Sequence, residues 1–365
     1  MSQTTWMIYG ATGDTGTIIA EEAVRQGHRP LLAGRSAGKL APLAEKLALP
    51  WLALDLNDPA RLAQALSQVR VVLNAAGPFM LSAAQLVQAC LAAGVNYLDI
   101  SGEIPALQIL FSQHQAARQK GIALIGSVGF GSLATNGLAA YLAGQLPGAV
   151  SLEIAAKAAN RQSSVGAARS TLRALAEGGK VYRSGQMVPY RLGKGFKTLR
   201  FPDGLTDIMP VPSADLLEAY YATGIPNVTA CIPFQRRLAA FLPLIQTALS
   251  FRPFRQRLEA LIERRAARQP VAQENAAKTS YSWARAAASN GQQIEAWLQL
   301  GEGYQFTAAS SVQAVSRVLR DQPLGSLTPA QAFGWDFVLG IPGVRLLSAV
   351  PLQPAPAVTA SSDGD

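Results

Sequence analysis

The chain has 365 residues, of which 49% are hydrophobic and 15% charged, a composition that excludes a disordered protein and suffices for two domains with buried cores. Its 32 basic and 23 acidic residues give a net charge of +9, but no nucleic-acid reader motif accompanies them, which argues against a nucleic-acid partner. Two cysteines and two histidines argue against a disulfide framework, a metal site and histidine-centred catalysis. No signal peptide and no apolar run of about 18 residues is present, so we expect a cytoplasmic protein.

The N-terminal segment predicts a nucleotide-binding turn. Residues 4–9 form a short apolar run typical of a buried strand, and three glycines spaced G-x-x-G-x-x-G separate it from an amphipathic helix that we expect from Thr17. Glycine lets the backbone turn sharply and approach a pyrophosphate, which the free N–H groups of the helix would bind. The alternative is a structural turn without a ligand. The cofactor residues predicted here are Gly10, Thr12, Gly13, Asp14, Thr15 and Gly16.

The end of the next strand indicates which dinucleotide binds. Residues 29–33 form a second apolar run, which leads into Arg35 and Ser36 about twenty residues after the glycines. An NAD site places an acidic residue here to bind the ribose 2′-hydroxyl, whereas an NADP site uses arginine for the 2′-phosphate. Residues 23–44 contain no acidic residue, and Lys39 adds a further cation. We therefore expect NADP(H) rather than NAD(H), the alternative being that Arg35 is a solvated loop residue.

Strand-like and helix-like segments alternate through the first third of the chain. The further predicted strands are residues 51–55, 69–74, 95–100 and 122–127, and the predicted helices are 40–49, 59–67, 81–93 and 104–120. This alternation predicts an α/β fold, a Rossmann-type doubly wound parallel sheet. Beyond residue 150 we expect a strand over 152–158, a helix over 165–177, a hairpin within 182–200, a hairpin joining 278–288 to 292–300, and helices over 312–319 and 328–338.

These elements predict a second, inserted α+β domain. We expect a Rossmann dinucleotide-binding domain over residues 1–135 and an α+β substrate or dimerisation domain over 136–305. Closing helices over 306–345 would return to the Rossmann domain, and residues 351–365 would form a disordered tail. We also expect a homodimer.

Polar and small residues recur where the predicted strands end, which is where such sheets bind ligands. Asp55 ends the third strand, where it would accept a hydrogen bond from adenine or cap the next helix. Tyr97, Asp99 and Glu103 lie at the end of the fifth strand. We expect Asp99 and Glu103 first as proton donors, because burial can raise the pKa of a carboxylic acid. Each of these residues could instead serve only to stabilise a turn. The residues expected to line the ribose and nicotinamide are Asn74, Ala75, Ala76, Gly77, Pro78 and Phe79.

One segment is both basic and apolar. Residues 236–268 contain eight arginines but only two acidic residues, Glu259 and Glu263, interleaved with leucine, isoleucine and phenylalanine. Such a segment, Arg236–Arg268, can lie on an anionic membrane surface. The alternative is a helix pair whose arginines are solvated or face another subunit.

Together these motifs resemble the saccharopine dehydrogenase-like family, which includes saccharopine reductase and trans-acting enoyl reductases. GATGDTG, AGRS, NAAGPF, YLDISGE and SVGFGS occur in the family's order, and residues 303–334 resemble its closing segment. The resemblance implies a Rossmann domain interrupted by an α+β domain, with the glycines on the pyrophosphate and Arg35 with Ser36 on the 2′-phosphate. Many relatives that resemble the enoyl reductases carry an acidic residue where this chain has Gly131. This difference weakens any inference of their substrate or mechanism for this chain.

The function expected from these features is that of an NADP(H)-dependent oxidoreductase. It would transfer a hydride to a C=C or C=N bond of a small-molecule or lipid-like substrate. The alternative is a non-catalytic NADP(H)-binding sensor or scaffold, associated with a membrane surface through the basic segment. Substrate specificity should lie in residues 150–300, where no motif identifies it.

Overall fold

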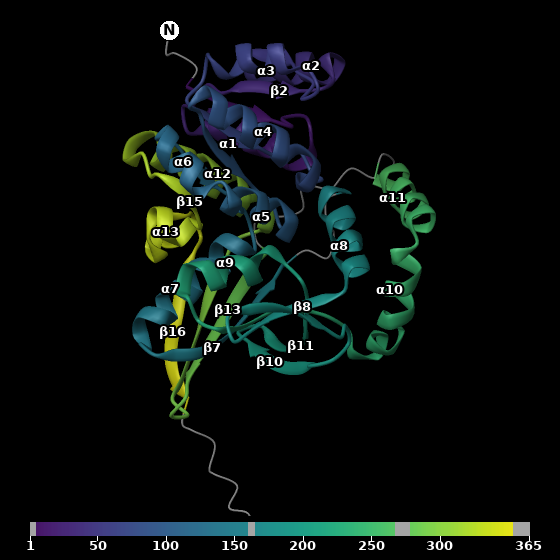
Figure 1. The fold of residues 1–365 in the computed structure, drawn as a ribbon, viewed down its shortest axis with the longest axis vertical. Helices are drawn as coiled ribbons and strands as arrows, with labels where there is room; N and C mark the ends of the chain where they lie inside the picture. Colours follow the sequence, from purple (N-terminus) through teal and green to yellow (C-terminus); the bar gives the residue numbers. More distant parts are fainter. Residues whose placement is uncertain (1–4, 160–164, 267–277, 353–365) are drawn as a thin grey trace, which may run out of the picture.

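The computed structural model describes residues 5–159, 165–266 and 278–352. Two seven-stranded sheets and one two-stranded sheet make up its β structure. The sheet that contains β2 and the sheet that contains β10 lie at opposite ends of the molecule, with helices around and between them (Figure 1). The predicted fold class, a doubly wound α/β sheet with an inserted α+β domain, is confirmed.

The first sheet is parallel throughout and has the order β3-β2-β1-β4-β5-β6-β15. Its strands are β1 (Trp6–Tyr9), β2 (Leu31–Gly34), β3 (Trp51–Ala53), β4 (Val71–Asn74), β5 (Asn96–Asp99), β6 (Ala123–Ile125) and β15 (Gly325–Leu327). All residues of β1, β2 and β4 are buried, as expected for strands covered on both faces. The strand order reverses between β1 and β4, which opens a crevice at their carboxyl ends.

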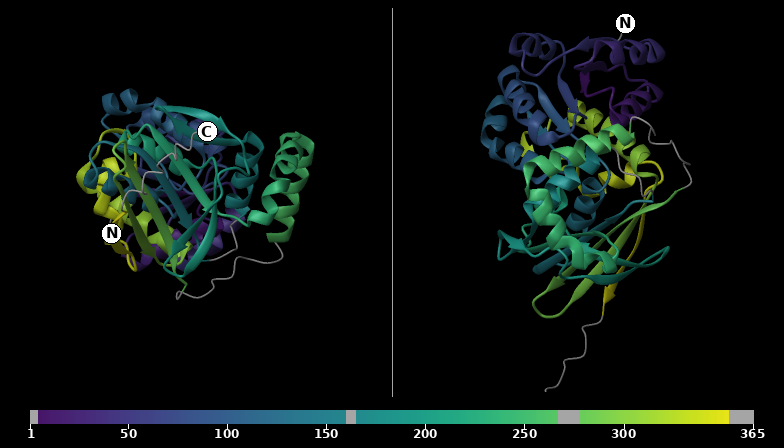
Figure 2. Two further views of the ribbon diagram at one scale, coloured as in Figure 1. Left: turned by 90° about the horizontal axis from the view of Figure 1, so that it is seen from below. Right: turned by 90° about the vertical axis from the view of Figure 1, so that its right-hand side faces the viewer.

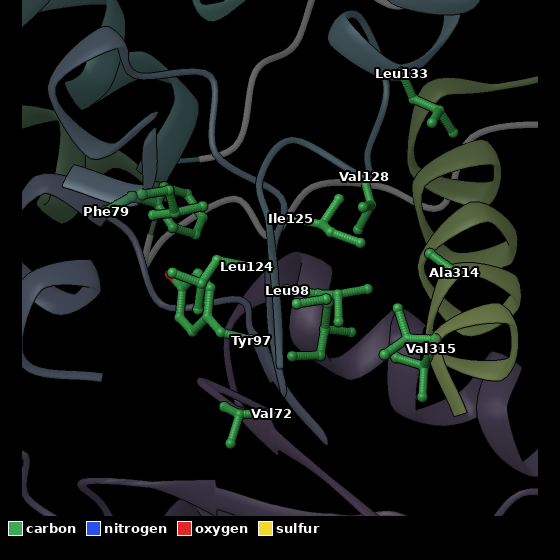
Figure 3. Packing of buried hydrophobic residues seen from close by; sticks show 14 of the residues in the cluster. Val72, Phe79, Tyr97, Leu98, Leu124, Ile125, Val128, Leu133, Ala314 and Val315 are labelled. Atoms are coloured by element: carbon green, nitrogen blue, oxygen red, sulfur yellow. The ribbon is translucent and has the colours of Figure 1, made fainter. Parts of the chain in front are cut away.

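Helices cover both faces of this sheet. They are α1 (Asp14–Arg25), α2 (Ala37–Leu47), α3 (Pro59–Leu66), α4 (Phe79–Ala93), α5 (Ile104–Ser112), α6 (His114–Lys120) and α12 (Gly303–Asp321). Leu98 and Ile125 point toward Val315 of α12, while Tyr97 points to the opposite side, toward Phe79 (Figure 3). The single helix predicted over 104–120 is interrupted at Gln113, whose backbone is not helical.

The C-terminal return to this sheet differs from the prediction. Residues 325–327 form β15, a seventh strand that pairs with β6 and that the sequence did not predict. The helix predicted over 328–338 is divided into α13 (Pro329–Phe333) and the short helix η2 (Trp335–Gly340). The division lies at Gly334, whose φ of 89° ends α13.

The second sheet is largely antiparallel, with the order β10-β11-β12-β7-β13-β14-β16. Its strands are β7 (Ala149–Lys157), β10 (Lys197–Phe201), β11 (Gly204–Pro210), β12 (Asn227–Pro233), β13 (Ser280–Ala288), β14 (Gln293–Leu300) and β16 (Arg345–Leu352). The hairpin predicted at Asn290-Gly291 joins β13 to β14. Pro351 and Leu352 belong to β16, so the tail predicted over 351–365 begins too early; residues 353–365 lie outside the described residues.

The remaining elements surround the second sheet. They are α7 (Ser132–Gln145), α8 (Val165–Glu177), β8 (Gly179–Arg183), β9 (Gln186–Tyr190), α9 (Ala214–Thr223), η1 (Arg236–Phe241), α10 (Leu242–Ser250) and α11 (Arg252–Ala266). The hairpin predicted within 182–200 is present as β8 and β9, which pair in a separate two-stranded sheet, but it is shorter than predicted, because β10 pairs with β11. Helices α7 and α9 were not predicted. No helix in the described ranges is long and apolar enough to cross a membrane.

Candidate functional site

The glycine turn connects β1 to α1 at the crevice of the first sheet. Gly10 has a φ of 85°, and a Cβ there would lie 2.7 Å from the backbone nitrogen of Ala76. A Cβ at Gly16 would overlap the carbonyl oxygen of Gly10. Gly13 occupies the N-cap of α1 and has no side chain to bind the first N–H groups of the helix. The turn thus forms a concave backbone surface that a Cβ at Gly10 or Gly16 would fill. The N-terminus of α1 beside it has free N–H groups that can bind an anion.

The charged residues after β2 and β3 lie at the same edge of the sheet. Arg35 and Ser36 are exposed. Burial raises the pKa of the Tyr9 hydroxyl; the nearby Arg35 guanidinium opposes that increase and the Asp55 carboxylate adds to it. Asp55 accepts the backbone N–H of Asn57 and does not cap α3, because Asp58 does so instead.

Asn74 supports the loop after β4 from beneath. Its Oδ1 accepts the backbone N–H of Ala76 at 3.0 Å, and its Nδ2 donates to the Ser82 hydroxyl at 2.9 Å and to the Tyr97 hydroxyl at 3.0 Å. All the hydrogen-bonding atoms of this buried amide therefore have partners inside the protein. Asn74 therefore positions the loop that packs against Gly10.

Asp99 joins the ends of β5 and β6. Its Oδ1 accepts the N–H groups of Ser101 and Ser127, both at 2.9 Å, and its Oδ2 accepts the Tyr97 hydroxyl at 2.9 Å. The side chain is fully buried. Burial raises the pKa of Asp99 to about 6, although its three hydrogen bonds oppose that increase. Burial also raises the pKa of Tyr97 well above its usual value.

Glu103 caps the N-terminus of α4 from the neighbouring loop. Its two carboxyl oxygens accept the N–H groups of Phe79 at 3.1 Å and Met80 at 2.9 Å. The Ser170 hydroxyl, which belongs to α8, donates to the same carboxylate at 2.6 Å. Glu103 thus connects the loop and helix at the carboxyl edge of the first sheet to α8.

A cavity of about 480 Å³ lies between the carboxyl edge of the first sheet and the second sheet. Of the predicted cofactor residues, Thr15, Ala75, Gly77 and Phe79 line it. Tyr97, Asp99 and Glu103 do not, although Ser170 extends the hydrogen bonding of Glu103 to its wall. Its other described lining residues include Ile100, Gly102, Gly129, Phe130, Thr171, Ala174, Leu175, Met209, Val211, Pro212, Ser213, Ile232, Phe234, Glu302, Gly303, Tyr304 and Thr307.

Sequence reasoning did not predict the wall of this cavity that lies opposite the first sheet. It comes from α8, from β11 and β12, and from the start of α12, where the Glu302 carboxylate accepts the N–H groups of Tyr304 and Gln305. Residues 303–308 were noted for their family resemblance alone. The signal that was available is Glu302 itself, since a carboxylate at the start of a helix is favoured by the positive end of the helix dipole.

Comparisons with known proteins bear on this site. Residues 6–125 match the family model described as the saccharopine dehydrogenase NADP binding domain. The predicted family resemblance is confirmed. The match supports a nicotinamide cofactor at the glycine turn, where the concave backbone surface at Gly10 and Gly16 fits a pyrophosphate.

The similar proteins include two relatives and one solved structure that bear on the site. A saccharopine dehydrogenase-like oxidoreductase of Bos taurus is 34% identical over 147 residues, which are 35% of this chain and 34% of that protein. A Mycobacterium tuberculosis protein named as a trans-acting enoyl reductase is 32% identical over 138 residues, 36% of this chain and 33% of its own. The chain thus covers about a third of the length of these relatives. Apo saccharopine dehydrogenase (L-Glu forming) from Saccharomyces cerevisiae has the same fold, with a TM-score of 0.64, 14% identity and coverage of 96% of this chain and 100% of that one.

Proposed function

We propose that this protein is an NADP(H)-dependent oxidoreductase that acts on a C=C or C=N bond of an uncharged, largely apolar substrate. The observation that carries the proposal is the position of the 480 Å³ cavity, which is lined on one side by the nucleotide edge of the first sheet and on the other by the second sheet. The names of the relatives, an oxidoreductase and an enoyl reductase, support it.

The chain would hold the cofactor along the carboxyl edge of the first sheet. The turn around Gly10 and the N-terminus of α1 would bind the pyrophosphate, and Arg35 with Ser36 would bind the 2′-phosphate. When bound, the reduced nicotinamide supplies a hydride. The loop at Ala75–Phe79, which Asn74 supports, would orient the ring toward the cavity.

The cavity wall supports an apolar substrate. None of its described lining residues is lysine, arginine or histidine, so it offers no cation to a substrate carboxylate. Glu302 is its one charged residue among them, and that carboxylate caps α12. Phe130, Met209 and Phe234 are typical of a site that binds by excluding water.

Proton transfer is assigned to the pair Ser170 and Glu103. The Ser170 hydroxyl lines the cavity and donates to the Glu103 carboxylate at 2.6 Å. In the oxidative direction Glu103 would accept a proton from the substrate through Ser170, and in the reductive direction the same proton would return. Tyr97 and Asp99 would then act as positioning residues, because their hydrogen bonds hold the loops after β4, β5 and β6.

The first experiment is a titration of the purified protein with NADPH and NADH, followed by nucleotide fluorescence. Arg35→Asp should weaken NADPH binding about 10- to 150-fold, since charged hydrogen bonds contribute about 1.5–3 kcal/mol, and should leave NADH binding nearly unchanged. Arg70→Asp is the matched control, because Arg70 is exposed just before β4, at the opposite edge of the sheet. An unchanged preference for NADPH in Arg35→Asp would refute the NADP assignment.

The second experiment separates an enzyme from a sensor. Oxidation of NADPH is measured with a panel of apolar enoyl and imine compounds. Ser170→Ala should lower kcat on any compound turned over, while NADPH binding stays at the wild-type level. Nucleotide binding without NADPH oxidation on any compound of the panel would favour the non-catalytic sensor.

A further inference from the structure

Helices α10 and α11, preceded by η1, form an arm at the side of the molecule, on the far side of α8 from the body (Figure 1). Seen from below, the arm is separated from the rest of the protein except along one side (Figure 2). We propose that this arm, residues 236–262, is a docking surface for an anionic lipid membrane.

One face of each helix in the arm is used for packing on the body. Leu242 and Leu249 of α10 are buried, and Leu242 belongs to an apolar cluster against which Leu175 of α8 also packs. Glu259 of α11 pairs with Arg173 of α8 at 3.0 Å and with Arg169 at 3.4 Å. Because both helices turn these faces toward α8, their opposite faces point away from the protein.

The outward faces are apolar. Half of the exposed large hydrophobic side chains in the described part of the chain lie between Leu238 and Leu261. The spacing of Phe241, Leu244 and Ile245 places them on one side of a helix. Monomeric proteins rarely expose such a concentration without a partner. The members are Leu238 (44% exposed), Phe241 (55%), Leu244 (70%), Ile245 (41%), Phe251 (66%), Phe254 (47%) and Leu261 (56%).

The charge of the arm selects the partner. Arg237, Arg252 and Arg257 are exposed, and the described residues provide no acidic partner for them. Glu259, the acidic residue of residues 236–262, is buried against α8. Exposed arginines beside apolar side chains are complementary to the headgroups and acyl boundary of an anionic bilayer. A second copy fits less well, because two chains of net charge +9 would bring like charges together.

The arm is next to the proposed substrate cavity. Helix α8 contributes Ser170, Thr171, Ala174 and Leu175 to the cavity wall and packs against α10 and α11. Helix α8 alone therefore separates the cavity from the arm. The membrane proposal does not depend on the proposed reaction, since vesicle binding is measured without a substrate.

The test is co-sedimentation of the full chain with phosphatidylcholine vesicles, with and without phosphatidylserine. Binding should require phosphatidylserine. The double variant Arg252→Gln/Arg257→Gln should lower the partition coefficient about 30-fold, at roughly 1 kcal/mol for each arginine. The control is Arg70→Gln/Lys120→Gln, which removes the same charge from exposed positions outside the arm and should bind within about twofold of the wild type.

A second pair of variants tests the apolar face. Leu244→Ser/Phe254→Ser should lower vesicle binding at least about tenfold, while Leu205→Ser, at an exposed position of β11 (65%), should not. Melting temperature and NADPH binding should be unchanged in both, which shows that the variants fold. Absence of vesicle binding, equal binding to neutral vesicles, or loss of a dimer in the arm variant without loss of vesicle binding would each overturn the proposal.

Discussion

The buried carboxyl of Asp99 should make stability depend on pH in a direction unusual for an aspartate. Burial raises its pKa from 3.8 to about 6, about two units, which correspond to about 3 kcal/mol. Ionisation is therefore easier in the unfolded chain. The contribution of Asp99 to stability is complete below about pH 4 and is lost as the pH rises through about 6.

Asp99→Asn removes this titration and keeps most of the geometry. The amide oxygen can still accept the N–H groups of Ser101 and Ser127, but an acceptor for the Tyr97 hydroxyl is lost, at a cost of about 1 kcal/mol at every pH. The free energy of unfolding of the wild type minus that of the variant should fall by about 2–2.5 kcal/mol between about pH 4 and pH 7. The assay is urea denaturation at a series of pH values. A difference that does not change with pH would refute the reasoning.

Three further predictions concern single side chains. Gly16→Ala should lower the free energy of unfolding by about 1–3 kcal/mol and weaken NADPH binding, because its Cβ would overlap the Gly10 carbonyl. The control Gly38→Ala, in helix α2 with open space around its Cβ, should raise the free energy of unfolding by about 0.4–1 kcal/mol and leave NADPH binding unchanged. Burial, with Asp215 and Asp99 nearby, raises the pKa of Glu218 well above its usual value, so the unfolded chain ionises first and the contribution of Glu218 to stability falls as the pH rises above about 4. Glu218→Gln should therefore gain stability relative to the wild type from acid to neutral and alkaline pH; a difference that does not change with pH would contradict this. The arginines of α8 lower the pKa of Glu259, so Glu259→Gln should cost about 1–3 kcal/mol at neutral pH, and denaturation curves should show the difference disappearing as the pH falls below about 4.

The nucleotide half of the site was predictable because its signals are local. A short apolar run, three glycines and a helix pattern are contiguous in the sequence, and they predict the turn whichever residues pack around it. The strands that alternate with amphipathic helices follow the same logic, and for them the main errors were at the ends of elements. Helix α8 was predicted over its observed residues because Gly178 and Gly179 mark its end.

The missed elements depend on distant parts of the chain. Helix α7 is apolar on nearly every side, because it is buried between α9 and the second sheet, so it lacks the one-sided pattern of a surface helix. Strand β15 has three residues and exists through its pairing with β6, about 200 residues earlier in the sequence. The cavity wall combines α8, β12 and Tyr304, which only the fold brings together.

Strand β15 and helix α12 complete the first sheet but are synthesised near the end of the chain, and this has a consequence for folding during synthesis. The segment that matches the family model ends at Ile125, but Leu98, Ile125 and Val128 pack against α12, which begins about 180 residues later. A nascent chain that has emerged only to the end of β6 exposes that apolar face and an unpaired strand edge. The inserted domain must therefore leave the ribosome before the first sheet can be completed. Synthesis thus passes through a long aggregation-prone interval, during which chaperone binding would protect the chain.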